Sequence, residues 1–90
     1  MELALDDMDA TIDYIARENP QAAERVAKQI WTSGESIGDN PRIGRPGRLP
    51  DSREWVVSHT PYVLAYRIKS NQIEIMRVLH GRQSWPETLV

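Results

Sequence analysis

The sequence has no cysteine, and this absence excludes both a disulfide framework and a metal site built on thiolates. It has only two histidines, His59 and His80, which are too few for a convincing zinc site. No apolar run approaches the roughly 18 residues that a membrane-spanning helix needs. The N-terminus is acidic rather than basic, so no secretory signal peptide is recognisable. We therefore expect a soluble cytoplasmic protein with no metal, no cofactor and no membrane partner.

Charge is distributed unevenly along the chain, which we expect to form a single domain over residues 1–90. Residues 1–40 contain nine acidic and three basic side chains, whereas residues 41–90 contain four acidic and eight basic ones, seven of them arginine. Arginine suits planar, bidentate contacts with carboxylates or phosphates. The C-terminal half therefore either meets an acidic partner, such as nucleic acid or an acidic protein segment, or is an ordinary solvated surface.

Apolar residues at helical spacing predict a first helix that ends near Glu18. Its apolar stripe consists of Leu5, Met8, Ile12 and Ile15. Four acidic residues lie largely off this stripe, and we interpret them as a solvated face rather than as metal ligands. They are Asp6, Asp7, Asp9 and Asp13.

A second helix is predicted to begin with Asn19 as its N-cap and Pro20 at its first position. Its apolar stripe contains Ala23, Val26, Ile30 and Ile37. Residues 38–41 (GDNP) should stop it. The connection between the two helices is very short, so they should form an antiparallel hairpin.

The remaining chain reads as a loop followed by three strands. Residues 42–53 (RIGRPGRLPDSR) are rich in glycine, proline and arginine, and we interpret them as a connector that contributes to an electropositive rim. Strands are predicted over 54–59, 62–69 and 72–80, and the short turns between them favour an antiparallel meander. One face of this three-stranded sheet must be buried against the helical hairpin, which gives an α+β domain of two layers.

Four segments carry a resemblance to a known family. In order, ENPQAAERV, NPRIGRPGR, SREWVVSHTPYVLAYRI and VLHGRQSWP resemble the RelE/ParE superfamily of bacterial toxins from type II toxin–antitoxin systems, with the closest likeness to the ParE branch. The fold that this resemblance implies agrees with the predicted helices and strands. Family members usually begin with a strand before the first helix, and here only residues 1–3 precede the matching point. Either the chain was cut or its start was assigned late, or this member lacks the strand. A missing strand would expose a sheet edge or leave a neighbour unpaired, so we expect marginal stability without a partner.

The resemblance leaves two activities to compare. The RelE branch cuts messenger RNA on the ribosome, whereas the ParE branch is known for poisoning DNA gyrase. RNA cleavage needs a general acid, a general base and positive charge at the scissile phosphate. Nuclease members typically have an arginine where this chain has Val63, and lysines where it has residues 54–57 (EWVV). Glu54 would repel RNA, although some nuclease relatives use a glutamate as base. With a pI near 5.6, the sequence fits the ParE branch better.

His80 and Arg82 are the catalytic candidates if the chain is a nuclease. The resemblance places them near a catalytic histidine and a phosphate-contacting arginine of some nuclease relatives, and histidine suits acid–base work. Without the middle-strand arginine they make a weak active site, so we favour no catalytic residue. We expect His80 to end the last strand with its ring hydrogen-bonded beside Gly81.

The aromatic residues have two interpretations each. Trp85 either anchors a target, where tryptophan is enriched, or folds back into the core. Trp31 and Trp55 are expected in the core or facing the antitoxin. Tyr62 and Tyr66 are expected to pack between sheet and helices rather than to stack on bases.

The resemblance implies a cognate, ParD-like antitoxin with a DNA-binding dimer and a disordered tail that folds across the helical hairpin and sheet on binding. It implies DNA gyrase as the target, with the ribosome and messenger RNA as an alternative, and a non-toxic antitoxin-binding module as a second alternative. Replacing Arg77 or Arg82 with alanine should raise the antitoxin dissociation constant. The residues expected to contact antitoxin or target are Arg45, Arg48, Arg53, Arg67, Arg77, Arg82 and Trp85.

Overall fold

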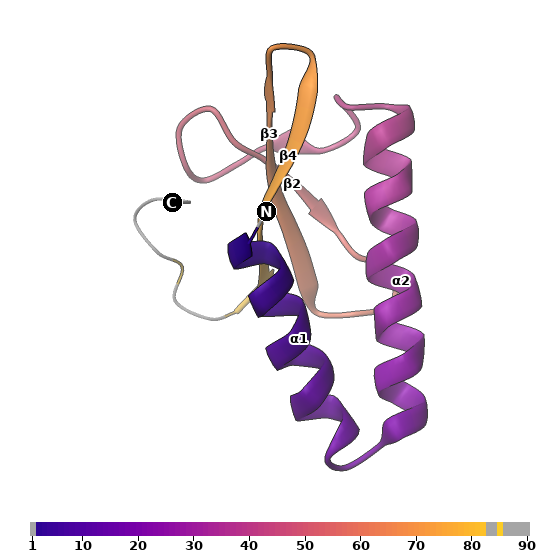
Figure 1. The fold of residues 1–90 in the computed structure, drawn as a ribbon. Helices are drawn as coiled ribbons and strands as arrows, with labels where there is room; N and C mark the ends of the chain where they lie inside the picture. Colours follow the sequence, from indigo (N-terminus) through magenta and orange to yellow (C-terminus); the bar gives the residue numbers. More distant parts are fainter. Residues whose placement is uncertain (1, 83–84, 86–90) are drawn as a thin grey trace.

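The computed structural model describes residues 2–82 and Trp85. Two helices are followed by a four-stranded antiparallel sheet, and the helices run side by side along the molecule (Figure 1). The connection between the helices and the hairpin between the last two strands lie at opposite ends of the view. The elements are α1 (Glu2–Ala16), α2 (Pro20–Asp39), β1 (Arg45–Pro46), β2 (Arg53–Val56), β3 (Tyr62–Lys69) and β4 (Gln72–His80).

The start of α2 is fixed by the cap that the sequence predicts. The Asn19 side chain accepts a hydrogen bond from the Ala22 N–H at 3.0 Å, and Pro20 occupies the first helical position. At the other end, the Asn40 N–H donates to the Ser36 carbonyl at 3.0 Å. α1 ends at Ala16, slightly earlier than expected, because the chain must turn before it reaches the Asn19 cap. No helix in the described residues is long and apolar enough to cross a membrane.

The sheet has the order β1-β2-β3-β4, so the predicted meander of β2, β3 and β4 is confirmed. A two-residue strand, β1, is added from the segment predicted as a loop, and it pairs Arg45 with Glu54. β2 ends at Val56 rather than at the predicted residue 59. The reason is a turn in which the Thr60 N–H donates to the Val57 carbonyl and His59 adopts the left-handed backbone conformation, with φ of 63°.

The core lies between the helical hairpin and one face of the sheet. Its fully buried side chains come from α2, β3 and the turn after β2, and the largest are Tyr66, Ile37, Leu64 and Val57. The Tyr66 hydroxyl accepts a hydrogen bond from the Gly44 N–H at 2.9 Å and donates one to the Pro41 carbonyl at 2.7 Å. A side chain at Gly44 would collide with this hydroxyl, since an added Cβ would lie 2.6 Å from it. Tyr66 thus fixes the start of the arginine-rich segment, and the prediction that it packs against the core is confirmed.

α1 is tied to β4, which is the edge strand of the described sheet. Asp7 accepts two hydrogen bonds from the Arg77 guanidinium, at 2.6 and 2.9 Å, and one from the Val78 N–H at 2.9 Å. These bonds raise the pKa of Arg77 above its ordinary value. The prediction that Asp7 belongs to a solvated face is therefore wrong, because its carboxylate satisfies groups on the strand edge. Asp6, Asp9 and Asp13 are exposed as expected.

Candidate functional site

A pocket lies where β4 ends and where several of the residues singled out in the sequence meet. Its cavity volume is about 480 Å³. β1, β2, β3 and the loops between them supply its other walls. The lining residues are Arg45, Arg48, Val56, Pro61, Val63, His80, Gly81 and Arg82. The fold therefore brings together four predicted residues that are up to 37 positions apart: Arg45, Arg48, His80 and Arg82.

Two of these arginines are held by a buried carboxylate. Glu54 is only 3% exposed, and it accepts a hydrogen bond from Arg45 Nη2 at 3.2 Å and one from the Arg48 backbone N–H at 2.7 Å. Arg48 Nε lies 3.4 Å from the same carboxylate. Burying a carboxylate is unfavourable unless charge and hydrogen bonds compensate for the lost hydration. The hydrogen bonds of Glu54 therefore hold β1 and the following loop against β2.

The ring of His80 faces the backbone and a neighbouring aromatic ring. Its Nδ1 accepts a hydrogen bond from the Arg82 N–H at 3.1 Å, and its ring meets that of Tyr62 edge-on, with centroids 5.6 Å apart. The Gly81 N–H donates to the Pro61 carbonyl at 2.8 Å, which closes the strand end. Burial, with a smaller contribution from Tyr14, raises the pKa of the Tyr62 hydroxyl above its ordinary value. The expected hydrogen bond of the His80 ring beside Gly81 is confirmed.

Trp85 folds back on the strand end. Its indole N–H donates to the His80 carbonyl at 3.2 Å, and the Arg48 guanidinium carbon lies 3.6 Å from the ring centroid. This distance is typical of a cation–π contact. Trp85 therefore packs on the surface of its own domain, where it covers part of Arg48, rather than in the core, and its role as a target anchor stays a prediction.

The other predicted arginines lie elsewhere. Arg77 reaches Asp7 on α1, and Arg67 on β3 forms an ion pair with Glu74 on β4 at 3.2 Å. Arg53 donates to the Gly44 carbonyl at 2.7 Å. The structure thus divides the seven predicted contact residues among three places: the pocket at the end of β4, the contact of Arg77 with α1, and a second cavity that Arg53 and Arg67 both line.

In chemical terms the pocket can hold an anion beside exposed arginines, but its wall contains the apolar Val63 where the nuclease pattern requires a cation. The side chain of Val63 is buried. Among the described residues, no group of three or more His, Cys, Asp or Glu side chains could hold a metal ion.

Sequence reasoning missed an apolar groove between the helical hairpin and β4. Its cavity volume is about 300 Å³, and its walls are almost entirely apolar. Trp31 is 70% exposed at its rim and Leu5 is 58% exposed, so a core position for Trp31 is excluded. The available signal was the position of Trp31 directly after Ile30, one step off the buried stripe of α2. The other residues of the groove are Ala4, Met8, Ile30, Gly34, Glu35, Leu64, Ile75 and Val78.

The chain is similar to known proteins in both sequence and fold. Toxin Y4kP of Sinorhizobium fredii, a protein assigned as a toxin, is 41% identical over 86 residues, which cover 96% of this chain and 88% of that protein. Toxin RelE2 of Caulobacter vibrioides is 36% identical over 78 residues, which cover 87% of this chain and 86% of the relative. Among solved structures, the chromosomal ParDE TA system from P. aeruginosa matches with a TM-score of 0.78 and 25% identity, over 87% of each chain. A sequence model of the family described as "ParE toxin of type II toxin-antitoxin system, parDE" matches residues 1–85, and the chain therefore belongs to the ParE family of toxins.

Proposed function

We propose that this ParE-family toxin acts by protein–protein contact with DNA gyrase, stalls the enzyme with cut DNA, and has no nuclease activity of its own. The observation that carries the proposal is the state of the pocket at the end of β4. The carboxylate of Glu54, which does not line the pocket, is buried and paired with two arginines that do, and the ring of His80 accepts a hydrogen bond from the Arg82 N–H. RNA cleavage requires a general base and a general acid that reach the substrate, together with charge at the phosphate.

A second function is favoured by one specific comparison. The Caulobacter relative is named RelE2, and His80 and Arg82 share one pocket in this chain. A ribosome-dependent endoribonuclease would use His80 for proton transfer and Arg82 for phosphate charge. The apolar wall at Val63 weighs against this alternative, because nothing at that position would offset the charge that develops on the phosphate.

The test uses the purified chain in two parallel reactions: a supercoiling assay with gyrase and plasmid, and a translation reaction read by primer extension. Accumulation of cleaved plasmid with intact messenger RNA is the expected result. Cut messenger RNA with unaffected gyrase would overturn the proposal in favour of the second function. The variant H80A should retain the effect on gyrase, with R17E, at the far end of the helical hairpin, as the matched control.

We further infer that a cognate antitoxin neutralises this toxin by laying a tail segment in the apolar groove. The similar P. aeruginosa structure is that of a ParDE system, and this likeness supports an antitoxin partner. Exposed Trp31 and Leu5 supply the large apolar surface that an amphipathic segment buries on binding. Arg82 is exposed at the other pocket and is available for a carboxylate of the tail.

Replacing Trp31 with alanine should weaken antitoxin binding by tenfold or more, since tryptophan anchors typically contribute about 2 kcal/mol or more. R82A should weaken it only a few-fold, as expected for an exposed charge. Isothermal titration with the purified antitoxin measures both. W55A is unsuitable as a control because Trp55 packs against the core, so Y14A, an exposed aromatic outside the groove, serves instead. Equal affinities of W31A and Y14A would remove the groove from the interface.

A further inference from the structure

The sheet has an open edge that is distinct from the pocket and the groove. Strand β3 continues to Lys69, but its ladder with β2 ends at the pair formed by Arg53 and Tyr66. The last residues of β3 therefore have no partner strand on the side of β2. The Tyr62 carbonyl accepts a hydrogen bond from the Val57 N–H on that side. Because strand backbone groups alternate, Ile68 directs its N–H and C=O to the same side.

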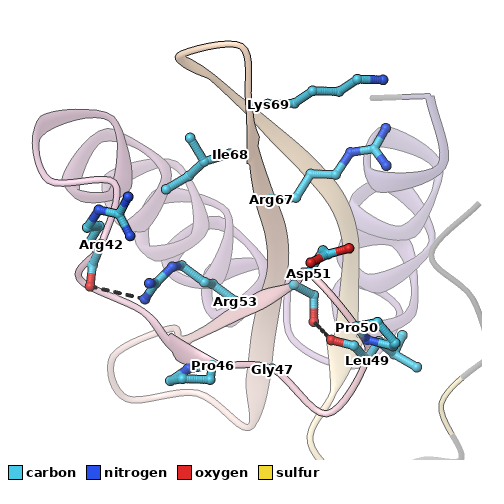
Figure 2. A pocket seen from close by; sticks show the side chains of 11 residues that line it. Arg42, Pro46, Gly47, Leu49, Pro50, Asp51, Arg53, Arg67, Ile68 and Lys69 are labelled. Carbon is cyan, nitrogen blue, oxygen red and sulfur yellow. Dashed lines mark hydrogen bonds between the residues drawn. The ribbon is translucent and has the colours of Figure 1, made fainter.

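This edge forms one wall of a cavity of about 700 Å³ (Figure 2). The loop between β1 and β2 forms the facing wall, and we call this cavity the β3 notch. It is larger than both the pocket at the end of β4 and the apolar groove. Its lining residues are Arg42, Pro46, Gly47, Leu49, Pro50, Asp51, Ser52, Arg53, Arg67, Ile68 and Lys69.

Basic side chains flank the notch on both faces of the sheet. Figure 2 shows Arg42 and Arg53 on the same side of β3 as Ile68, and Arg67 and Lys69 on the other side. Within the notch the acidic counterpart is Asp51, and Arg67 is also paired with Glu74 outside it. The notch therefore has a net positive charge on a chain whose total charge is −2.

Two arginines of the notch, Arg53 and Arg67, have hydrogen-bonding capacity or charge that the described residues leave unused. Arg53 Nη1 donates to the carbonyls of Gly44 at 2.7 Å and of Arg42 at 3.5 Å, and no carboxylate within the described chain pairs with it. Arg67 uses only Nη2 in its contact with Glu74, and its Nε is buried without a hydrogen-bond partner among the described residues. Orientation by neutral carbonyls leaves the Arg53 charge uncompensated and reduces the entropy that a ligand must overcome.

We propose that the β3 notch binds an extended acidic peptide segment of a partner protein, which continues the line of β2 along the open edge of β3. Such a segment would exchange backbone hydrogen bonds with Ile68, and its successive side chains would alternate between the two faces of the sheet. Each face offers cations to a carboxylate, which explains the otherwise odd placement of Arg53 and Lys69 on opposite sides. The apolar side chains of Leu49 and Ile68 suit a peptide that mixes acidic and aliphatic residues.

An acidic peptide fits the notch better than a nucleic acid does. The lining contains no aromatic ring on which a base could stack, and stacking is a main source of affinity for single strands. Asp51 would repel a phosphate backbone, whereas a peptide can place an uncharged residue beside it. The inference goes beyond the proposed function, because it does not require the partner to be the antitoxin or gyrase.

The experiment is a nuclear magnetic resonance titration of the ¹⁵N-labelled chain with the capped peptide Val-Glu-Glu-Val-Glu-Glu-Val. We expect saturable shifts at the Ile68 amide and in the loop over residues 47–52, which weaken as salt is added. The matched peptide with glutamine in place of glutamate should produce no saturable shift at these amides. Absence of shifts with the acidic peptide, shifts confined to another face, or stronger binding of an oligothymidylate at the notch would each overturn the proposal.

Two variants keep the test specific. Arg42 and Lys69 are exposed, and their side chains make no hydrogen bond or ion pair within the described chain, so K69E and R42E should fold normally. Each should weaken peptide binding roughly two- to fivefold. R17E reverses a charge at the opposite end of the molecule and should bind as the parent does. Equal binding by all three variants would overturn the proposal.

Discussion

The pocket at the end of β4 and the β3 notch use the same residue type in opposite ways. In the pocket, Arg45 and Arg48 share the buried carboxylate of Glu54, which offsets one of their two charges, and Trp85 covers part of Arg48. In the notch, Arg53 is held by carbonyl groups and has no carboxylate partner within the described chain. The number of arginines in a segment therefore does not measure the charge that a partner meets. What decides it is how many of the guanidinium groups the fold pairs with an acid.

The largest expected effect on stability comes from removing Glu54, the buried acid that pairs with the arginines of the pocket and has no counterpart beside Arg53 within the described residues. E54A should lower the free energy of unfolding by about 3 kcal/mol, because it deletes hydrogen bonds from Arg45 and from the Arg48 N–H. Urea denaturation measures the loss. The control, E24A, changes an exposed glutamate of α2 and should remain within about 0.5 kcal/mol of the parent. The comparison fails if the two variants are equally stable.

The next largest effect concerns the anchor at the start of the arginine-rich segment, residues 42–53, which contributes to both the pocket and the notch. Y66F should lower the free energy of unfolding by about 2 kcal/mol. The reason is that it leaves the Gly44 N–H and the Pro41 carbonyl without their partner, the hydroxyl of a fully buried side chain. The exposed Tyr14 provides the control, Y14F, which should be neutral. Thermal and urea unfolding of the two variants should separate them. A neutral Y66F would mean that water replaces the hydroxyl.

A smaller effect distinguishes an arginine that ties elements together from one that is exposed. R77A should lower the free energy of unfolding by about 1–2 kcal/mol, since Asp7 loses a bidentate partner on a partly buried surface. R82A should leave stability unchanged, because its side chain is exposed and makes no hydrogen bond or ion pair within the described chain. Equal stability of R77A and R82A would show that the contact between α1 and β4 depends on packing alone.

The parts of the fold that could be predicted from the sequence are those that local patterns determine. The Asn19 cap, the apolar stripes and the alternation of β3 are local signals, and the helices, the antiparallel meander and the burial of Tyr66 followed from them. The pairing of Asp7 with Arg77 joins residues 70 positions apart. Spacing along a chain contains no information about such contacts, so the arginines could be identified but their partners could not. Trp31 was left with two interpretations for a related reason, because only the packing of α1 on α2 decides which residues beside a stripe stay exposed.

The smallest effect concerns Arg67 and Glu74, the one ion pair beside the notch in the described part of the chain. The hydrogen bond from Arg67, with weaker contributions from the charges of Arg67 and Lys69, lowers the pKa of Glu74 below its ordinary value. A carboxyl group with a lowered folded-state pKa stabilises the fold above its unfolded-state pKa, and this contribution is lost as the pH falls through the folded-state pKa. R67Q should therefore raise the pKa of Glu74 toward its ordinary value, and K69Q should raise it less. Nuclear magnetic resonance titration of the Glu74 carboxyl measures both shifts. If K69Q had the larger effect, the notch would hold Glu74 by diffuse charge rather than by a directed bond, and Arg67 would be as available to an acidic peptide as Arg53 is.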